Sequence, residues 1–200
     1  MFPFVETIRT ENGKAENLDF HEARFLNTYK HFYKHFPSFS IKKIAEEMVI
    51  PNELMKLRIT YGEELGDVSS TPYTLRNVSN LQIVRKDINY DYKLTDRSPL
   101  DEAFSMRGRA DDVLIVRHGL VTDTSIGNVA FWDGTVWKTP KTPLLKGTRC
   151  ESLLLGKKIS ATDISEADIF SYYKISIFNA MIPFGTVVFA ISKNETVFEP

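Results

Sequence analysis

The sequence has little sulfur chemistry, because Cys150 is its only cysteine among 200 residues. One cysteine excludes an internal disulfide and any metal site built from several thiolates. It also favours a reducing compartment, which predicts a cytoplasmic protein. A lone cysteine without a nearby catalytic partner is more often a small packing residue than a nucleophile, and we predict that role for Cys150.

An excess of charge of one sign is also missing. Lys and Arg total 25 against 26 for Asp and Glu, and 42% of the residues are hydrophobic. Such a balance is typical of a globular protein and predicts no nucleic-acid partner and no anionic membrane partner. The start, M-F-P-F-V-E-T-I-R, has no basic residues followed by an apolar run, so we expect no secretory signal.

Long hydrophobic runs are absent as well. The most apolar stretch, residues 175–191, is interrupted by Asn179, Pro183 and Gly185. It is shorter than the roughly 20 residues that a membrane-spanning helix needs. We therefore predict two buried strands around a turn rather than a membrane segment.

Several common functional motifs are missing too. The sequence contains no G-x-S-x-G, G-x-x-x-x-G-K-[ST] or G-x-G-x-x-G segment, which removes the usual signals of hydrolases, P-loop enzymes and dinucleotide binders. His31 and His35 lie four residues apart in a predicted helix but have no third ligand nearby. We predict an exposed helical pair and no metal site.

The first part of the chain alternates between strand and helix patterns. Residues 4–10 have strand-like content and are followed by the turn signal Asn12-Gly13. Helices are predicted next, one with Asp19 as its N-cap and one capped by Ser40. The expected elements are a strand at 4–10, helices at 19–36 and 40–48, a strand at 54–61 and a loop or domain boundary at 62–72.

The remainder contains several short strands with helical patches between them. We expect strands at 81–85, 112–117, 128–132, 135–138 and 186–192, and helices near 99–107, 148–156 and 165–169. This pattern predicts an α+β chain with two lobes, residues 1–76 and 77–200.

Three ordered motifs in the second half carry the strongest functional signal. They are V-T-D-T-S-I-G-N-V from Val121, the strand pair A-F-W-D-G-T-V-W-K-T-P, and P-L-L-K-G-T-R. Together with F-H-E-A-R-F, Y-K-L-T-D-R-S and F-N-A-M-I-P, they resemble the class IV (fold type IV) enzymes that depend on pyridoxal 5′-phosphate (PLP). The resemblance implies a two-lobed fold, with a small α/β sandwich lobe and a pseudo-barrel lobe that binds the cofactor.

The resemblance also implies which residues hold the cofactor. PLP needs a lysine that condenses with its aldehyde and a carboxylate that keeps its pyridine nitrogen protonated. Lys93 lies 30 residues before Asp123, the spacing of these two groups in the family. Asp123 stands where the family usually has glutamate, and Asn128 closes the same motif. Read without the family, Lys93 is a solvated strand lysine and Asp123 a turn residue.

Phosphate binding is implied for three further segments. The H-x-x-R pattern of the family matches His21 and Arg24, and an arginine fork suits a phosphate. Backbone amides at the start of a helix suit it as well. The resemblance places such amides at Gly147 and Thr148, and a second phosphate turn at Asn179 and Ala180.

The substrate residues are less well defined. Lyases of this family carry R-G-x-G-x-R-G-Y after the first-lobe strand, whereas this chain reads R-I-T-Y-G-E-E from Arg58. Arg58, Arg97 and Arg107 are candidates for binding a substrate carboxylate, with Tyr92 as a neighbour. Each arginine is equally well explained as a solvated or ion-paired surface residue. The first lobe is also shorter than in typical members.

The F-N-A-M-I-P segment favours one activity within the family. It resembles the N-A-L-M-P form of aminodeoxychorismate lyases, where transaminases more often carry Ser/Thr pairs. The implied function is conversion of 4-amino-4-deoxychorismate to 4-aminobenzoate and pyruvate in folate biosynthesis. An aminotransferase of the branched-chain or D-amino acid type and a non-catalytic PLP-binding relative stay open. A small-molecule amine is the implied substrate, and a homodimer is the implied assembly.

Overall fold

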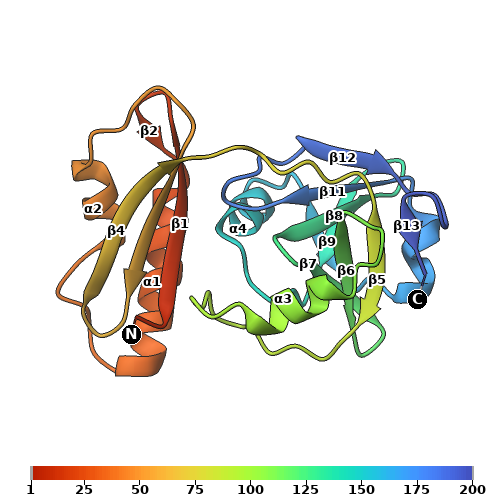
Figure 1. Cartoon of the computed structure of the whole chain (residues 1–200), viewed down its shortest axis with the longest axis horizontal. Coiled ribbons are helices and arrows are strands. Elements are labelled where there is room, and N and C mark those ends of the chain that lie inside the picture. The colour runs from red at the N-terminus through yellow and green to blue at the C-terminus, as the bar shows by residue number, and fades with distance from the viewer. Residues whose placement is uncertain (1, 200) are drawn as a thin grey trace. The chain divides into compact units, whose positions relative to one another are not determined.

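The structure is a computed structural model and describes residues 2–199. It divides into two compact units. The first comprises Met1–Leu75 and Tyr92–Asp96, and the second comprises Arg76–Asp91 and Arg97–Pro200. Figure 1 shows the helices and strands of both.

The first unit is built on a four-stranded antiparallel sheet with two helices. Its strand order is β2-β1-β3-β4, with β1 Phe4–Glu11, β2 Lys14–Ala15, β3 Met55–Tyr61 and β4 Leu65–Pro72. Helices α1 (Leu18–Tyr33) and α2 (Ile41–Glu47) pack against the sheet. Aromatic and branched side chains from both layers, among them Ile8, Phe25 and Tyr61, form the buried core. This unit contains the predicted strands and two helices, although α1 ends at Tyr33, so His35 is exposed but lies outside the helix.

Two local predictions for this unit are wrong. Asp19 is not the N-cap of α1, because the helix begins at Leu18. Its N-cap is Asn17, which has a left-handed conformation at φ 56°. Residues 62–72 are not simply a loop, because β4 occupies most of them. This edge strand is almost fully exposed and polar, so hydropathy gives no signal for it, and its pairing with β3 provides the order. The Ser40 cap is confirmed, since its hydroxyl accepts from the Lys43 amide.

The segment Tyr92–Asp96 joins the first unit although the predicted division at residue 76 puts it in the second. Backbone hydrogen bonds explain the difference. The Val5 amide donates to the Lys93 carbonyl at 3.0 Å, and the Thr95 amide donates to the Pro3 carbonyl at 2.8 Å. Leu94 also forms a β-bridge with Phe4. Strand β1 therefore carries the segment that contains Lys93.

The second unit is built on a mixed nine-stranded sheet. Its main path is β10-β9-β8-β7-β6-β5-β13, and β11 pairs with both β8 and β12. The strands are β5 Leu81–Arg85, β6 Asp112–Arg117, β7 Leu120–Thr124, β8 Asn128–Trp132, β9 Trp137–Pro140, β10 Ser160–Thr162, β11 Lys174–Phe178, β12 Val187–Ala190 and β13 Val197–Phe198. The helices are α3 Ser98–Ser105, α4 Thr148–Leu155 and the 3₁₀ helix η1 Glu166–Ser171.

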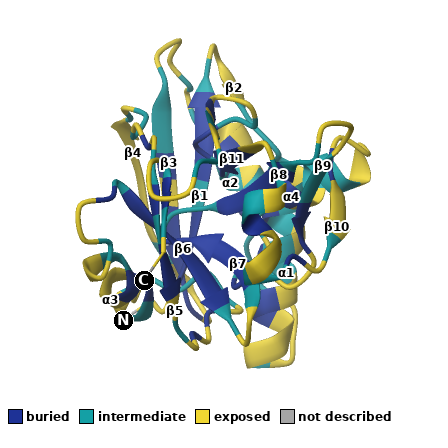
Figure 2. Cartoon of the chain, turned by 90° about the vertical axis from the view of Figure 1, so that its right-hand side faces the viewer, coloured by how far each residue is buried: buried dark blue, intermediate teal, exposed yellow. Residues whose placement is uncertain are grey.

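Burial explains why some strands of the second unit were predictable from the sequence. Figure 2 shows β6 and β7 in the dark blue of buried residues, and all but the last residue of β6 are buried. Strands buried on both faces read as continuous apolar runs, which is why 112–117 was predictable. The apolar stretch 175–191 forms the antiparallel strands β11 and β12. Strand β11 is buried as predicted, whereas in β12 only Val187 is buried. Cys150 packs in the core, and burial raises the pKa of its thiol to about 12.

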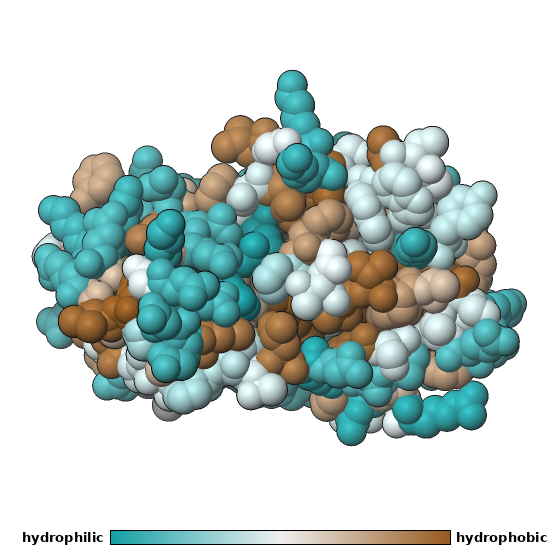
Figure 3. All heavy atoms as spheres, turned by 90° about the horizontal axis from the view of Figure 1, so that it is seen from above, coloured by the Kyte–Doolittle hydropathy of each residue, from teal (hydrophilic) through white to brown (hydrophobic). Residues whose placement is uncertain are grey.

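The surface is mixed in polarity. Figure 3 shows hydrophilic atoms over much of one face, with hydrophobic atoms in smaller groups. Large apolar side chains that are strongly exposed include Phe36 at 81% and Val49 at 95%. Within residues 2–199, no helix combines the length and the apolar character needed to cross a membrane.

Candidate active site

The first unit contains a buried charge cluster centred on Glu6. Glu6, on β1, is fully buried, and its carboxylate accepts from Arg24 Nε at 2.9 Å and Arg24 Nη2 at 2.6 Å. His21 Nδ1 lies 2.5 Å from the same carboxylate. Burial raises the pKa of Glu6, but the charge of Arg24 and the contacts with His21 outweigh it and lower the pKa to about 2. Glu6 is therefore ionised, and His21 donates to it.

His21 is neutral in this cluster. Burial lowers its pKa, and the positive charges of Arg24 and Lys93 lower it further against the opposing effect of Glu6. The influence of Lys93 shows that its ammonium group lies near enough to act on the cluster. Tyr92, the residue before Lys93, packs with its ring centroid 5.1 Å from that of His31 and 4.8 Å from that of Phe32.

The second unit contains a buried carboxylate in a different setting. Asp123, on β7, is 4% exposed, and it accepts from Asn128 Nδ2 at 2.8 Å and from the Leu145 amide at 3.0 Å. Both donors are neutral. Burial raises the pKa of Asp123 to about 7, because these hydrogen bonds only partly offset it. In the described part of the chain, Asp123 has no salt-bridge partner.

Asn128 links Asp123 to the start of α4. Its Nδ2 also donates to the Leu145 carbonyl at 2.9 Å. Its Oδ1 lies against Gly147, where an added Cβ would come within 2.1 Å of that oxygen, so only glycine fits. Thr148 follows as the first residue of α4 and is buried. Four of the predicted cofactor residues, Asp123, Asn128, Gly147 and Thr148, thus lie in one connected group.

Asn179 builds the predicted second turn. Its Oδ1 accepts from the Met181 and Ile182 amides, both at 2.8 Å, and its Nδ2 donates to the Ile126 carbonyl at 2.8 Å. Arg149 holds the same turn, since it donates to the Asn179 carbonyl at 2.7 Å and the Ala180 carbonyl at 2.9 Å. Residues 179–182 are therefore tied to α4 and to the 124–127 turn.

The three arginines predicted for substrate binding are distributed over both units. Arg58 is exposed on β3 of the first unit. Arg97 precedes α3 in the second unit and donates to the Ser125 carbonyl at 2.8 Å. Arg107 donates to the Phe104 carbonyl at 3.3 Å and stacks on that ring, 4.0 Å from its centroid. Their proposed role stays a prediction.

Comparison with known proteins agrees with these features. The family model for class IV amino-transferases matches residues 4–188. An uncharacterized protein from Haemophilus influenzae is 36% identical over 187 residues, covering 90% of this chain and 98% of that protein. The chain belongs to the class IV aminotransferase family.

Solved structures place this class IV protein among enzymes of the same fold. A crystal structure from Haemophilus somnus, provisionally named 4-amino-4-deoxychorismate lyase, is 34% identical, with a TM-score of 0.86 and coverage of 91% of this chain and 97% of that one. A provisionally named amino-acid aminotransferase from Mesorhizobium loti has a TM-score of 0.79 at 22% identity, covering 96% of this chain and all of that one. The predicted fold type IV architecture is confirmed, and the protein is a PLP-dependent lyase or aminotransferase.

The residues of this class IV protein fit the cofactor of its family. Asp123 is a desolvated carboxylate that accepts hydrogen bonds from neutral donors, and the charge of Arg117 offsets its burial only in part, so a pyridinium N–H would be a fitting partner. Gly147 precedes α4 without a side-chain cap, and the first amides of a helix suit a phosphate. Lys93 and Arg24 both belong to the first unit.

Sequence reasoning missed two members of this arrangement. Glu6 looked like an ordinary position in an alternating strand, and only its contacts with Arg24 and His21 reveal its role. Arg149 stood in the quoted G-T-R motif, but its contacts with the 179–182 turn join segments thirty residues apart. A buried acidic residue in the first strand, paired with the H-x-x-R motif, is the signal that could have identified Glu6.

Proposed function

We propose that this chain binds PLP through Lys93 and converts 4-amino-4-deoxychorismate to 4-aminobenzoate and pyruvate, a step of folate biosynthesis. The observation that carries the choice of a lyase is the Asn179 turn. Its side chain replaces the hydroxyl pairs implied for transaminases, and it satisfies the Met181 and Ile182 amides. The 34% identity with the provisionally named lyase of Haemophilus somnus supports the same choice.

The residues of the chain divide the work between the two units. PLP supplies an electron sink when it is bound. Lys93 holds it and then takes the proton from the amine-bearing carbon of the substrate. Asp123 keeps the pyridine nitrogen protonated, while Arg24 binds the phosphate in an orientation set by Glu6.

Surroundings of these groups suit their tasks. The Lys93 amine must lose its proton to attack an aldehyde. A pyridinium beside Asp123 favours the ionised carboxylate, which reverses the effect of burial on its pKa. We further propose that the protein works as a homodimer in the cytoplasm, a compartment supported by its single cysteine.

The test uses the purified protein with PLP and 4-amino-4-deoxychorismate, without any amino acceptor. We expect pyruvate and fluorescent 4-aminobenzoate in equal amounts. Lys93→Ala should lower turnover by about 10²–10⁴-fold, the usual contribution of a positioned base. Lys86→Ala is the matched control, because Lys86 pairs with Glu102 at the surface of the second unit.

Each result separates the candidates. Amine transfer that requires a keto-acid acceptor would replace the lyase by an aminotransferase. Borohydride fixation of PLP to Lys93 without turnover of either kind would indicate a non-catalytic relative. If borohydride fixes no PLP to wild type, the cofactor proposal fails as well.

A further inference from the structure

A buried carboxylate outside the cofactor motifs stands at the start of β6. Asp112 is fully buried, and its Oδ1 accepts from the Val113 amide at 2.7 Å and from the Ser125 amide at 3.3 Å. Its Oδ2 is buried and has no hydrogen-bond partner in the described structure. The nearest cationic atom is Arg76 Nη1 at 3.5 Å. A buried charge in this setting is costly, so a role beyond packing is expected of it.

The Ser125 amide connects Asp112 to the turn between two cofactor strands. This 124–127 turn follows Asp123 on β7 and precedes Asn128 on β8. The Thr124 hydroxyl closes the turn, accepting from the Ile126 amide at 3.3 Å and the Gly127 amide at 3.1 Å. Asp112 therefore fixes one side of a turn that joins two predicted cofactor residues.

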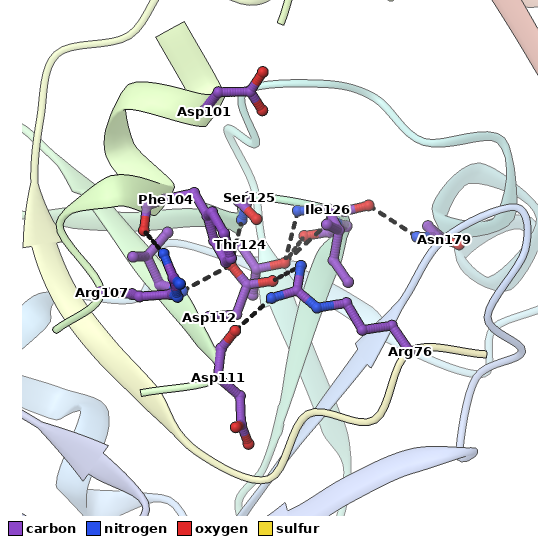
Figure 4. Close-up of polar contacts among 12 residues, drawn as sticks. Arg76, Asp101, Phe104, Arg107, Asp111, Asp112, Thr124, Ser125, Ile126 and Asn179 are labelled. Atoms are coloured by element: carbon purple, nitrogen blue, oxygen red, sulfur yellow. Dashed lines mark hydrogen bonds and ion pairs between the residues drawn. The ribbon is translucent and has the colours of Figure 1, made fainter. Parts of the chain in front are cut away.

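The other side of the turn is bound to the proposed phosphate segment. The Ile126 carbonyl accepts from Asn179 Nδ2, and Asn179 Oδ1 accepts from the amides that follow it in the 179–182 turn. Figure 4 shows the line of contacts from Arg76 through Asp112 and the 124–127 turn to Asn179. A shift of the turn at Asp112 would thus be transmitted to Asn179.

Arg76 is itself held in place. Its Nη2 donates to the Asp111 carbonyl, and its guanidinium stacks 4.7 Å from the centroid of the Phe104 ring. Arg107 stacks on the same ring at 4.0 Å. The planar guanidinium is therefore oriented toward Asp112 by contacts from α3 and from the start of β6.

We propose that Asp112, oriented by Arg76, is a positioning residue that sets the 124–127 turn and, through Asn179, the turn at which the cofactor phosphate binds. Only the part of this inference that concerns phosphate binding rests on the proposed PLP function. The ordering of the two turns is a property of the protein without cofactor. Neither Asp112 nor Arg76 is among the residues proposed to hold the cofactor.

The first experiment compares Asp112→Asn with wild type by titration with PLP and with pyridoxal, which lacks the phosphate. We expect PLP to bind about tenfold more weakly, within the range for changes in supporting residues of other sites. Binding of pyridoxal should stay within about twofold of wild type, because the effect acts through the phosphate turn. General loosening of the unit would weaken both ligands equally, and that result would overturn the proposal.

The second experiment needs no cofactor. Hydrogen exchange of the unliganded Asp112→Asn variant should become faster at the Met181 and Ile182 amides, while the amides of Leu114–Arg117 on β6 and those of β8 keep wild-type rates. Unchanged exchange at Met181 and Ile182 overturns the positioning role, whether or not PLP binds. Absence of PLP binding in wild type would instead overturn the proposed function and leave this result standing.

Matched variants complete the design. Asp111→Asn is the control, because the Asp111 carboxylate accepts from Ser79 and not from the turn. It should behave as wild type in both experiments. Arg76→Gln should reproduce a weaker form of the Asp112→Asn effect, and it keeps the test available if Asp112→Asn does not fold. Equal effects of Asp111→Asn and Asp112→Asn on PLP would contradict the proposal.

Discussion

The two units treat their buried carboxylates in opposite ways. Glu6 in the first unit faces Arg24 and His21, and its pKa falls to about 2 despite burial. Asp123 in the second unit faces two neutral donors, and its pKa rises to about 7. The first carboxylate is paired with the charge of Arg24, whereas the second accepts from neutral donors and feels only a weaker effect of Arg117. The difference indicates which half of the site is preorganised by protein contacts alone.

Removing Glu6 should produce the largest stability change. Glu6→Ala leaves Arg24 buried without its carboxylate, and loss of one partner of a buried ion pair costs about 3–5 kcal/mol. Both tryptophans of the chain, Trp132 and Trp137, lie in the second unit, so their fluorescence reports on that unit. Circular dichroism should show an earlier unfolding transition, with the tryptophan transition less affected.

The control for this change is Glu11→Ala on the same strand. Glu11 pairs with Arg9 but is one-third exposed, so its loss should cost about 1 kcal/mol or less. Equal destabilisation by the two variants would remove the contrast between the units.

The pH dependence of the protein without PLP should show the Asp123 effect. Its pKa is about 7 in the folded protein against the ordinary 3.8 of an aspartate, so folding favours the protonated form. Stability therefore falls as pH rises from about 4 to about 7, by an amount on the order of a few kcal/mol. Asp123→Asn should abolish that part of the slope, even though it loses one hydrogen bond. Parallel curves of unfolding free energy against pH for wild type and variant would show that the carboxylate is not desolvated.

The smallest of these effects concerns helix ends. In the first unit, Ser40 caps α2 through the Lys43 amide at 3.1 Å, while α4 in the second unit begins at Gly147 without a side-chain cap. Ser40→Ala should cost about 1 kcal/mol in chemical denaturation. Ser38→Ala, in the same loop and exposed, should cost nothing measurable.

Predictability from sequence also differed between the units. The buried strands β5, β6 and β8 were predicted to their observed bounds, because burial on both faces makes a strand a bounded apolar run. The exposed strand β4 was missed, because its order comes from pairing with β3 and not from its own composition. Local sequence patterns thus predict buried strands well, but they predict poorly an exposed edge strand that is ordered by pairing with its neighbour.

The site shows the same division. Asp123, Asn128, Gly147 and Asn179 were proposed from short motifs, and the structure connects them within one unit, while their cofactor role stays a prediction. Glu6 and Asp112 were missed, since each is buried by a partner far away in sequence and looks ordinary in its own segment. Contacts between distant segments are what a single sequence does not display.

The path of the chain has a consequence for anyone who would divide the protein. Tyr92–Asp96 belongs to the first unit, but it is flanked on both sides by segments of the second. A fragment that ended at Leu75 would lack Tyr92 and Leu94, which pack against its core, and would leave the edge of β1 at Val5 without an acceptor. The lysine that is proposed to carry the chemistry therefore also completes the smaller unit, because its carbonyl accepts from the Val5 amide. A single cut of the chain cannot produce either unit intact.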